Sequence, residues 1–433
     1  MPSLAEATRV WLKLGLLGFG GPAGQIALIH RLVVVERRWL GEAQFLHALN
    51  FCMLLPGPEA QQLAIYAGWL LHGWRGGLLA GTLFVLPGFL VIVALSAVYV
   101  AFAGTAWLAA LFLGLQAAVL AVVLEALLKL GRRALRTPAA GLIAAAAFVA
   151  IWVLHIPFPL IVLAAALLGT GLGQLAPARL ALAPAPPARP AEAGPGLAAA
   201  AGTLGRGLAL WLGPVLLLWL ALGGAHVLTQ MALFFSKMAI VTFGGAYAVL
   251  AWVAQAAVQD FGWLSAGQMI DGLALAETTP GPLILVLAFV GFVGAWQTAS
   301  GLAPWLAGPA AALLVTWVTF APSFLWIFLG APHVERLRGR PALDGALTAI
   351  TAAVVGVILN LALWFALHVL FAALTEAQLG PLRLLHPVWS SLDAPAALLA
   401  ALALVLLVGT RLGMLGTLLV CGLAGAVLRA LGL

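Results

Sequence analysis

The chain is short of charge, because Asp, Glu, Lys and Arg together make up only 8% of its 433 residues. Soluble domains usually carry about a quarter of charged residues, so the deficit excludes a soluble globular protein. Hydrophobic residues make up 64%, in long unbroken runs such as 108–128 rather than the short alternating stretches of a membrane barrel. A spanning helix needs about 20 mostly apolar residues. The composition predicts an all-α polytopic membrane protein.

Cysteine is scarce too, and signatures of metal or cofactor chemistry are missing. Cys52 and Cys421 lie far apart in apolar stretches, which excludes a metal-ligand pattern and a disulfide framework. The sequence has no H-E-x-x-H, G-x-S-x-G or Walker-type run. We therefore expect no cofactor, no metal and no catalytic residue. An intramembrane enzyme acting on lipids or peptides is the competing hypothesis from another class.

The net charge of +7 comes from arginines in short loops beside apolar runs. This pattern follows the positive-inside bias of membrane proteins, so we expect the lipid bilayer as a partner and no nucleic acid. The sequence leaves a homodimer open.

What the chain does contain is an internal repeat at a constant shift of 224 residues. The matches include rare residue types, which chance similarity between apolar stretches would not preserve in one register. They pair Lys13 with Lys237, Phe19-Gly20-Gly21 with Phe243-Gly244-Gly245, Trp39 with Trp263, Gln44 with Gln268, and Pro56-Gly57-Pro58 with Pro280-Gly281-Pro282. Beyond an insertion the register resumes at 235, as in Pro87 and Pro322. The sequence predicts two homologous halves.

The apolar runs predict about six helical segments in each half. Residues 1–175 form the first repeat, 176–206 a Pro/Ala-rich linker, 207–229 an unpaired transmembrane helix, and 230–433 the second repeat. One extra span after an even half reverses the second half, so we expect inverted repeats, as in many secondary transporters. The expected spans are 11–30, 44–72, 78–102, 107–128, 139–155, 158–175, 207–227, 233–257, 266–296, 304–330, 342–372, 394–409 and 412–430.

Counting cations with the N-terminus inside puts thirteen in the cytoplasm and five outside. Arg31, Arg37 and Arg38 fall in the outside group, against the rule. This misfit suggests that the first two segments of each half are not simple spans.

Helix breakers interrupt these same two segments in both halves. Paired glycines weaken a helix, and proline removes a hydrogen-bond donor. The breaks are Gly18 to Pro22, Phe243 to Gly245, Leu54 to Glu59 and Glu277 to Pro282. Irregular backbone at membrane depth is tolerated only where it is buried in protein or lines a cavity. A kink at a packing contact is the alternative for any single break, but the repetition favours discontinuous helices around a site.

A helix that restarts after a break presents free backbone amides, and helix N-termini bind anions. Thr279 before Pro280 reads as an N-cap, which leaves Gly281, Leu283 and Ile284 as donors, with Gly57, Glu59 and Ala60 in the first half. Two such ends and one lysine carry about two positive charges, enough to balance a dianion. The lysines have an alternative as residues that reach to the membrane interface.

Buried carboxylates beside such a site suggest proton coupling, because an ionised carboxylate repels an anion. Glu59, Glu277 and Asp271 are the candidates, although Glu59 has an alternative as a partner of its helix dipole. The candidate substrate-binding residues are Lys13, Gly20, Gly21, Gln25, Gly57, Glu59, Gln61, Lys237, Gly244, Gly245, Thr278, Thr279 and Gly281.

The breaks resemble those of a known family. The runs F-G-G-P-A-G-Q (19–25), L-L-P-G-P-E-A-Q-Q-L-A (54–64), T-F-G-G-A-Y (242–247) and A-E-T-T-P-G-P-L (276–283) are similar to those of the chromate ion transporter family, long two-domain type. The resemblance implies a multi-pass protein of the cytoplasmic membrane that exports chromate and confers resistance, with sulfate as a competing dianion. A transporter of sulfate or another oxyanion, and a channel, remain alternatives.

Overall fold

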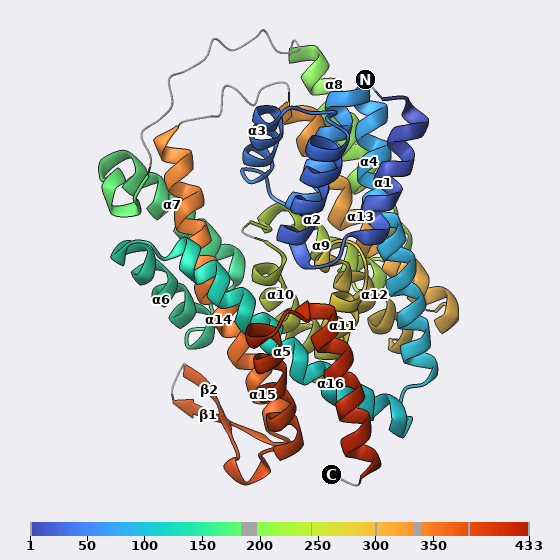
Figure 1. The fold of residues 1–433 in the computed structure, drawn as a ribbon, viewed down its shortest axis with the longest axis vertical. Helices are drawn as coiled ribbons and strands as arrows, with labels where there is room; N and C mark the ends of the chain where they lie inside the picture. The colour runs from blue at the N-terminus through green and yellow to red at the C-terminus, as the bar shows by residue number, and fades with distance from the viewer. Residues whose placement is uncertain are drawn as a thin grey trace. The chain divides into compact units, whose positions relative to one another are not determined.

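A computed structural model describes residues 2–182, 197–243, 245–298, 301–331, 340–379 and 382–431 (Figure 1). The chain divides into two compact units. The first comprises Met1–Val100, Ala188–Ala246 and Leu275–Arg338, and the second Ala101–Pro187, Tyr247–Ala274 and Gly339–Leu433. Each unit takes segments from both halves of the sequence, so the compact units do not coincide with the predicted repeats.

The first unit holds the segments with the helix breaks. Its elements are α1 (Leu4–Leu17), α2 (Gly21–His30), η1 (Arg31–Glu36), α3 (Glu42–Cys52), α4 (Glu59–Ala101), α8 (Leu197–Leu222), α9 (Val227–Val241), η4 (Leu283–Leu285), α12 (Val286–Gln297) and α13 (Pro304–Gly330). α4 contains two helical limbs that meet at His72 and Gly73, whose backbone angles are not helical.

The second unit is organised around α5 and α14. Its elements are α5 (Ala106–Ala134), α6 (Pro138–Trp152), α7 (Phe158–Leu175), η2 (Pro177–Leu180), α10 (Ala246–Gln255), η3 (Ala256–Asp260), α11 (Ala266–Thr278), α14 (Pro341–Leu370), β1 (Leu374–Leu379), β2 (Leu382–Pro387), η6 (Trp389–Ser391), α15 (Ala394–Gly409) and α16 (Gly413–Ala430). The first residue of α10, Ala246, and the end of α11 from Leu275 onward belong to the first unit. α14 packs against α5, α6 and α7, while α15 and α16 pack against α5. α7 and α14 meet closely at Gly169 and Gly345, where a Cβ atom on either would strike the other's carbonyl oxygen. Small residues serve such close helix contacts in membranes.

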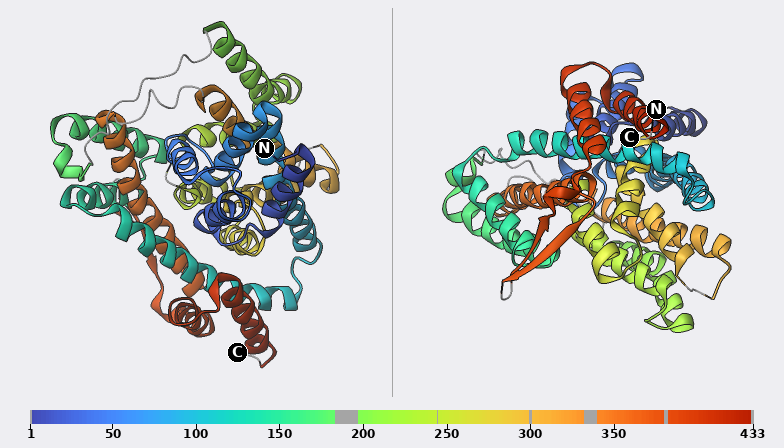
Figure 2. Two further views of the ribbon diagram at one scale, coloured as in Figure 1. Left: turned by 45° about the horizontal axis from the view of Figure 1, so that its top comes forward. Right: turned by 90° about the horizontal axis from the view of Figure 1, so that it is seen from below.

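Within the described residues, seven helices are long and apolar enough to cross a membrane, and four shorter apolar helices accompany them. The chain is therefore an all-α multi-pass membrane protein with two homologous halves and discontinuous helices. One departure is the antiparallel pair β1–β2, which pairs Leu374 with Pro387 and extends from the connection between α14 and α15 (Figure 2). The linker also differs, because α8 begins at Leu197, inside the stretch assigned to it. The Ala-rich run 198–201 favours helix there, and linker residues 183–196 lie outside the described residues.

The first two segments are helical hairpins that return to the end of the unit where they start. Arg37 at the end of η1 binds Glu6 at the start of α1, with 2.6 Å between Nη1 and Oε1. His72 Nε2 lies 2.9 Å from the carbonyl oxygen of Pro2, and the His30 ring lies 2.8 Å from the Glu42 carboxylate.

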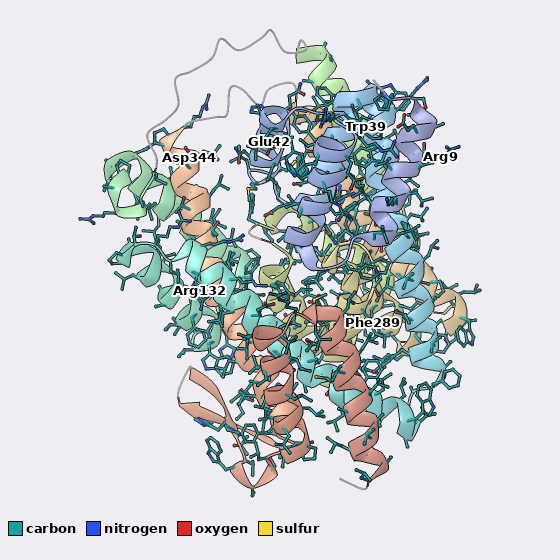
Figure 3. All side chains as sticks on the ribbon, in the orientation of Figure 1. Arg9, Trp39, Glu42, Arg132, Phe289 and Asp344 are labelled. Atoms are coloured by element: carbon teal, nitrogen blue, oxygen red, sulfur yellow. The ribbon has the colours of Figure 1, made fainter. Side chains whose placement is uncertain are left out.

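Figure 3 shows Arg9, Trp39 and Glu42 at this same N-terminal end of the unit. Arg31, Arg37 and Arg38 therefore lie beside the N-terminus rather than opposite it. The single spans expected over 11–30 and 44–72 are wrong, and with them the conflict with the positive-inside rule disappears.

Contacts within the first unit also show the inverted arrangement of the halves. The second limb of α4 packs on α13 with Gly77 against Phe328 and Gly81 against Phe324. Residue numbers rise along one helix as they fall along the other, so the two helices are antiparallel. These helices are equivalent in the repeat, since Pro87 corresponds to Pro322. Equivalent helices that run in opposite directions define an inverted repeat.

The repeat extends to local turns. Arg37 N bonds Leu32 O at 3.2 Å, and its counterpart Phe261 N bonds Ala256 O at 2.9 Å. Gln44 Oε1 accepts from Gly41 N, and the equivalent Gln268 Oε1 accepts from Ser265 N. Gln44 and Gln268, which the repeat pairs in the sequence, therefore both serve as helix caps.

Candidate oxyanion site

The two Pro-Gly-Pro breaks are tied to the opposite repeat by a reciprocal pair of hydrogen bonds. Gly57 N donates to Thr242 O at 2.8 Å, and Gly281 N donates to Gly18 O at 3.0 Å. The shift of 224 converts the first pair into the second. A two-fold relation makes a contact from i to j reappear as a contact from j to i. The breaks thus meet about a local pseudo-two-fold axis.

These bonds correct one expectation, because the Gly57 and Gly281 amides are not free donors. Both glycines have positive φ values, 127° and 99°, in a region that side chains disfavour. In this conformation each amide points toward the C-terminal end of a helix from the other half. The amide donates a hydrogen bond to a carbonyl there that has no partner within its own helix. The glycines therefore position the breaks instead of offering donors to an anion.

The Gln25 side chain joins the break at Gly18 in the first half to the break at Gly281 in the second half. Its exposed fraction is 1%, and Nε2 donates to Gly18 O at 3.0 Å and to Gly281 O at 2.5 Å. The equivalent position in the second half is Val249, which cannot make this bridge. Gln25 is therefore a structural contact between the halves that the repeat does not duplicate.

A small cavity of about 20 Å³ lies where the breaks meet. Its walls include the first turns of the restarting helices, Glu59 and Ala60 on α4 and Leu283 and Ile284 in η4, which leads into α12. First-turn amides have no partner within their own helix. The remaining lining residues are Pro22, Gln25, Gly57, Pro58, Thr242, Gly245, Ala246 and Pro282. The volume suits about one water molecule, which is less than a tetrahedral oxyanion occupies.

The structure brings four of the predicted binding residues to this cavity and leaves others outside its lining. Gln25, Gly57, Glu59 and Gly245 line it, while Gly281 reaches it through its bond to Gln25. Lys13 on α1 and Lys237 on α9 are exposed, and neither lines it. Gly20, Gly21, Gln61, Thr278 and Thr279 do not line it either, and Gly244 lies outside the described residues.

The threonines of the second break show why the expected N-cap is wrong. Thr278 and Thr279 hydroxyls both donate back to Leu275 O on α11, at 2.8 and 2.7 Å. The new helix starts at Leu283 after Pro282, without a side-chain cap. Thr279 therefore follows directly after α11 and bonds back to it rather than beginning the next helix.

The candidate carboxylates occupy three different surroundings. Glu59 lines the cavity as the first residue of α4. Glu277 is 3% exposed near the end of α11, and Asp271, in the second unit, accepts a hydrogen bond from Gln116 Nε2 at 2.7 Å. Only Glu59 combines a place at the cavity with the positive end of a helix dipole.

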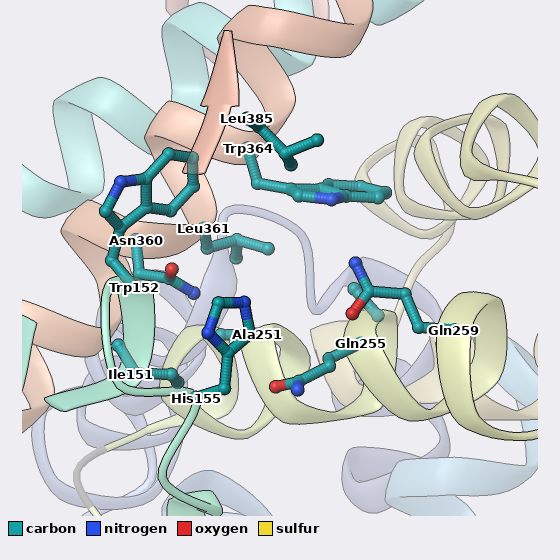
Figure 4. A pocket seen from close by; sticks show the side chains of 11 residues that line it. Ile151, Trp152, His155, Ala251, Gln255, Gln259, Asn360, Leu361, Trp364 and Leu385 are labelled. Atoms are coloured by element: carbon teal, nitrogen blue, oxygen red, sulfur yellow. The ribbon is translucent and has the colours of Figure 1, made fainter. Parts of the chain in front are cut away.

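Sequence reasoning missed Thr242, whose carbonyl holds Gly57. The signal was available, since the shift of 224 maps Thr242 onto Gly18, the first residue of the first break. The second unit contains another cavity, of about 50 Å³, where His155, Gln255, Gln259 and Asn360 face Trp152 and Trp364 (Figure 4). None of the predicted site residues lines it.

Comparison with known proteins decides the family. The model of the family described as chromate transporter matches residues 5–170 and 229–426. The chain belongs to this family. The chromate transport protein of Pseudomonas aeruginosa is 35% identical over 358 residues, covering 80% of this chain and 77% of that protein. The probable chromate transport protein of Synechococcus elongatus is 31% identical over 363 residues, covering 82% and 83%. No solved structure matches.

Proposed function

We propose that this protein is a secondary transporter that exports chromate across the cytoplasmic membrane and thereby gives chromate resistance. The observation that carries the proposal is the reciprocal pair Gly57–Thr242 and Gly281–Gly18, which joins both repeats at one cavity. Family membership, and the relatives named as chromate transport proteins, supply the substrate class.

The positive charge around the cavity suits a dianion for a physical reason. Two helix N-termini each contribute about half a positive charge, and their first-turn amides are hydrogen-bond donors. Because the repeats are inverted, the two helix N-termini reach the cavity from opposite sides of the membrane. Separation of the breaks toward one side or toward the other would open the site to each side in turn. Export of a dianion from a cell that is negative inside gains about 4.6 kcal/mol per 100 mV. The potential alone therefore favours the outward direction.

Glu59 supplies a means of proton coupling at the same cavity. A carboxylate about 4 Å from a unit negative charge opposes it by about 4 kcal/mol at an effective dielectric constant of 20. The anion and the ionised Glu59 compete for one helix N-terminus. Protonation of Glu59 would remove the competition, so anion occupancy and proton occupancy rise together.

The test uses inverted membrane vesicles, radiolabelled chromate and separately imposed electrical and pH gradients. We expect accumulation that responds to an interior-positive potential and falls in the presence of excess sulfate. Glu59→Gln should remove the part that follows the pH gradient, whereas Glu42→Gln, an exposed first-turn carboxylate of α3, should retain it. If sulfate accumulated but chromate did not under any gradient, the substrate would be another oxyanion and not chromate.

A further inference from the structure

The first unit contains a large groove that the proposed anion site does not use. It measures about 760 Å³ and lies between the second limb of α4, α8 and α13. Most of its lining residues are apolar, among them Val85, Leu86, Phe89, Leu210 and Phe320. A volume of this size falls in the range of small-molecule sites. α8, which forms one wall, is the helix that has no counterpart in the first repeat.

Contacts along α8 and α13 fix which end of the groove is which. Trp211 Nε1 donates to Val318 O, and Trp317 Nε1 donates to Leu210 O, each at 3.0 Å. One turn earlier, Gly207 packs against Leu325. Arg206 and Thr203, which line the groove, therefore stand at the C-terminal end of α13.

The turn of α4 lies at this same end. Gly77 packs against Phe328 on α13, and Trp74, just before it, lines the groove. The Arg75 guanidinium carbon lies 5.4 Å from the centre of the Trp74 ring. Two arginines and an exposed tryptophan thus gather at one end, a combination typical of the membrane interface.

Neither arginine is neutralised within the described residues. No carboxylate there lies within ion-pair distance of Arg206 or Arg75, and Arg206 Nε donates to the carbonyl of Gly202 in its own helix. Both side chains are exposed. Their positive charge is therefore available to a ligand.

The opposite end of the groove is apolar. Leu86, Phe89 and Leu313 line it, and Arg206 is the one charged residue among the described lining residues. All three walls are helices long and apolar enough to cross a membrane, so the groove opens toward hydrocarbon rather than water. An occupant must combine an anionic group with a long apolar chain.

We propose that this groove binds one phospholipid with an anionic headgroup. The phosphate lies at Arg206 and Arg75, and an acyl chain runs between α4 and α13 toward Leu313. Basic pockets between membrane helices bind anionic headgroups in this way. The inner wall includes Gln61, two residues beyond Glu59 in the first turn of α4, so the lipid contacts the helix that starts at the anion cavity.

The test is lipid retention by the purified full-length protein, measured by native mass spectrometry after exchange against equal amounts of phosphatidylglycerol and phosphatidylcholine. We expect selective retention of one phosphatidylglycerol. Arg206→Gln removes a charge from the headgroup site and should lower retention about fivefold. Leu86→Trp fills the path of the acyl chain and should lower it similarly.

Two matched variants control for general effects. Arg132→Gln removes an exposed cation from the end of α5, and Leu90→Trp enlarges an exposed α4 residue, 58% accessible, that does not line the groove. Both should retain the lipid as the unmodified protein does. Equal retention of both lipids would overturn the proposal. So would loss in Arg206→Gln with full retention in Leu86→Trp, which indicates attraction at the surface without a groove.

Discussion

The two Pro-Gly-Pro breaks make the same backbone hydrogen bond, but the side chains around them differ. Each break glycine donates to the end of a helix from the opposite repeat, Gly57 to Thr242 and Gly281 to Gly18. Yet Glu59 corresponds to Leu283, and Gln25 corresponds to Val249. The duplicated backbone therefore brings both breaks to one cavity, whereas one copy alone supplies the charged Glu59 and the bridging Gln25.

Substitution of the break glycines should have the largest effect. Gly57→Ala and Gly281→Ala place a side chain at positive φ, which costs about 1–3 kcal/mol, and we expect at least about a tenfold loss of chromate transport. Gly57→Ala should be the more severe, because its Cβ would lie 2.8 Å from Gln62 Nε2 and 3.0 Å from Ser323 Oγ, against 3.2 Å to Leu285 Cδ1 at Gly281. Vesicle uptake, corrected for protein amount, measures it.

The control is Gly141→Ala, at a helical glycine of α6 with open space around its Cβ position. It should transport normally. Normal transport by either break variant would contradict the assignment of the breaks to the site.

Placing a carboxylate in the second break should make the site symmetric in charge. Leu283→Glu puts a second negative charge at the cavity, and repulsion of roughly 2–4 kcal/mol should weaken anion binding at neutral pH by a factor of about 30 to several hundred. Equilibrium binding of radiolabelled sulfate or chromate to purified protein measures the change. Leu283→Gln, which has the same shape without the charge, should bind far more tightly than Leu283→Glu, and equal affinities for the two would exclude a charge effect.

Removal of the existing carboxylate should have the opposite sign. Glu59→Gln removes the carboxylate that competes with the anion. Chromate should therefore bind the variant more tightly than the unmodified protein, and this difference should grow as pH rises and Glu59 of the unmodified protein ionises. Below the pH at which Glu59 is protonated, the two proteins should bind alike. Binding curves measured across pH test this, and parallel curves for both proteins would show that Glu59 plays no part in coupling.

Loss of the bridge between the halves should chiefly affect stability. Gln25→Leu leaves Gly18 O and Gly281 O without their side-chain donor, at a cost of about 1–3 kcal/mol. Thermal unfolding in detergent should show a lower midpoint than in Gln230→Leu, a change on α9 at a partly exposed glutamine. Equal midpoints would mean that the bridge contributes nothing.

The repeated lysines should matter least. Lys13→Gln and Lys237→Gln alter exposed side chains that do not line the cavity, so we expect transport within about twofold of normal, as for weakly interacting surface charges. Uptake by the double variant measures it. A loss of tenfold or more would return the lysines to the site.

Much of the fold followed from the sequence, because rare residues in register revealed the repeat and its breaks. The expected α13, at 304–330, and α7, at 158–175, agree with the structure. The hairpins did not follow, since hydropathy measures how apolar a run is and not whether it turns back. The ion pair between Arg37 and Glu6 shows that the first hairpin turns back. Its signal in the sequence was the conflict of Arg31, Arg37 and Arg38 with the positive-inside rule.

The candidate site was predicted less completely. The breaks and Glu59 were found because Gly, Pro and buried carboxylates are conspicuous in an apolar chain. The prediction that the Gly57 and Gly281 amides are free donors was wrong. Their hydrogen bonds to the other repeat depend on tertiary contacts that no local sequence pattern encodes. The lysines were chosen for their pairing, which indicates common descent of the halves and not proximity to a ligand.

The central claim is that both breaks form one anion site. Equilibrium dialysis of the purified protein against radiolabelled chromate, with Gly57→Ala and Gly281→Ala beside it, tests that claim directly. A shared site predicts one chromate bound per chain and a strong loss of that binding in each variant. Two chromates per chain, with one retained in each variant, would contradict the account and assign a separate site to each half.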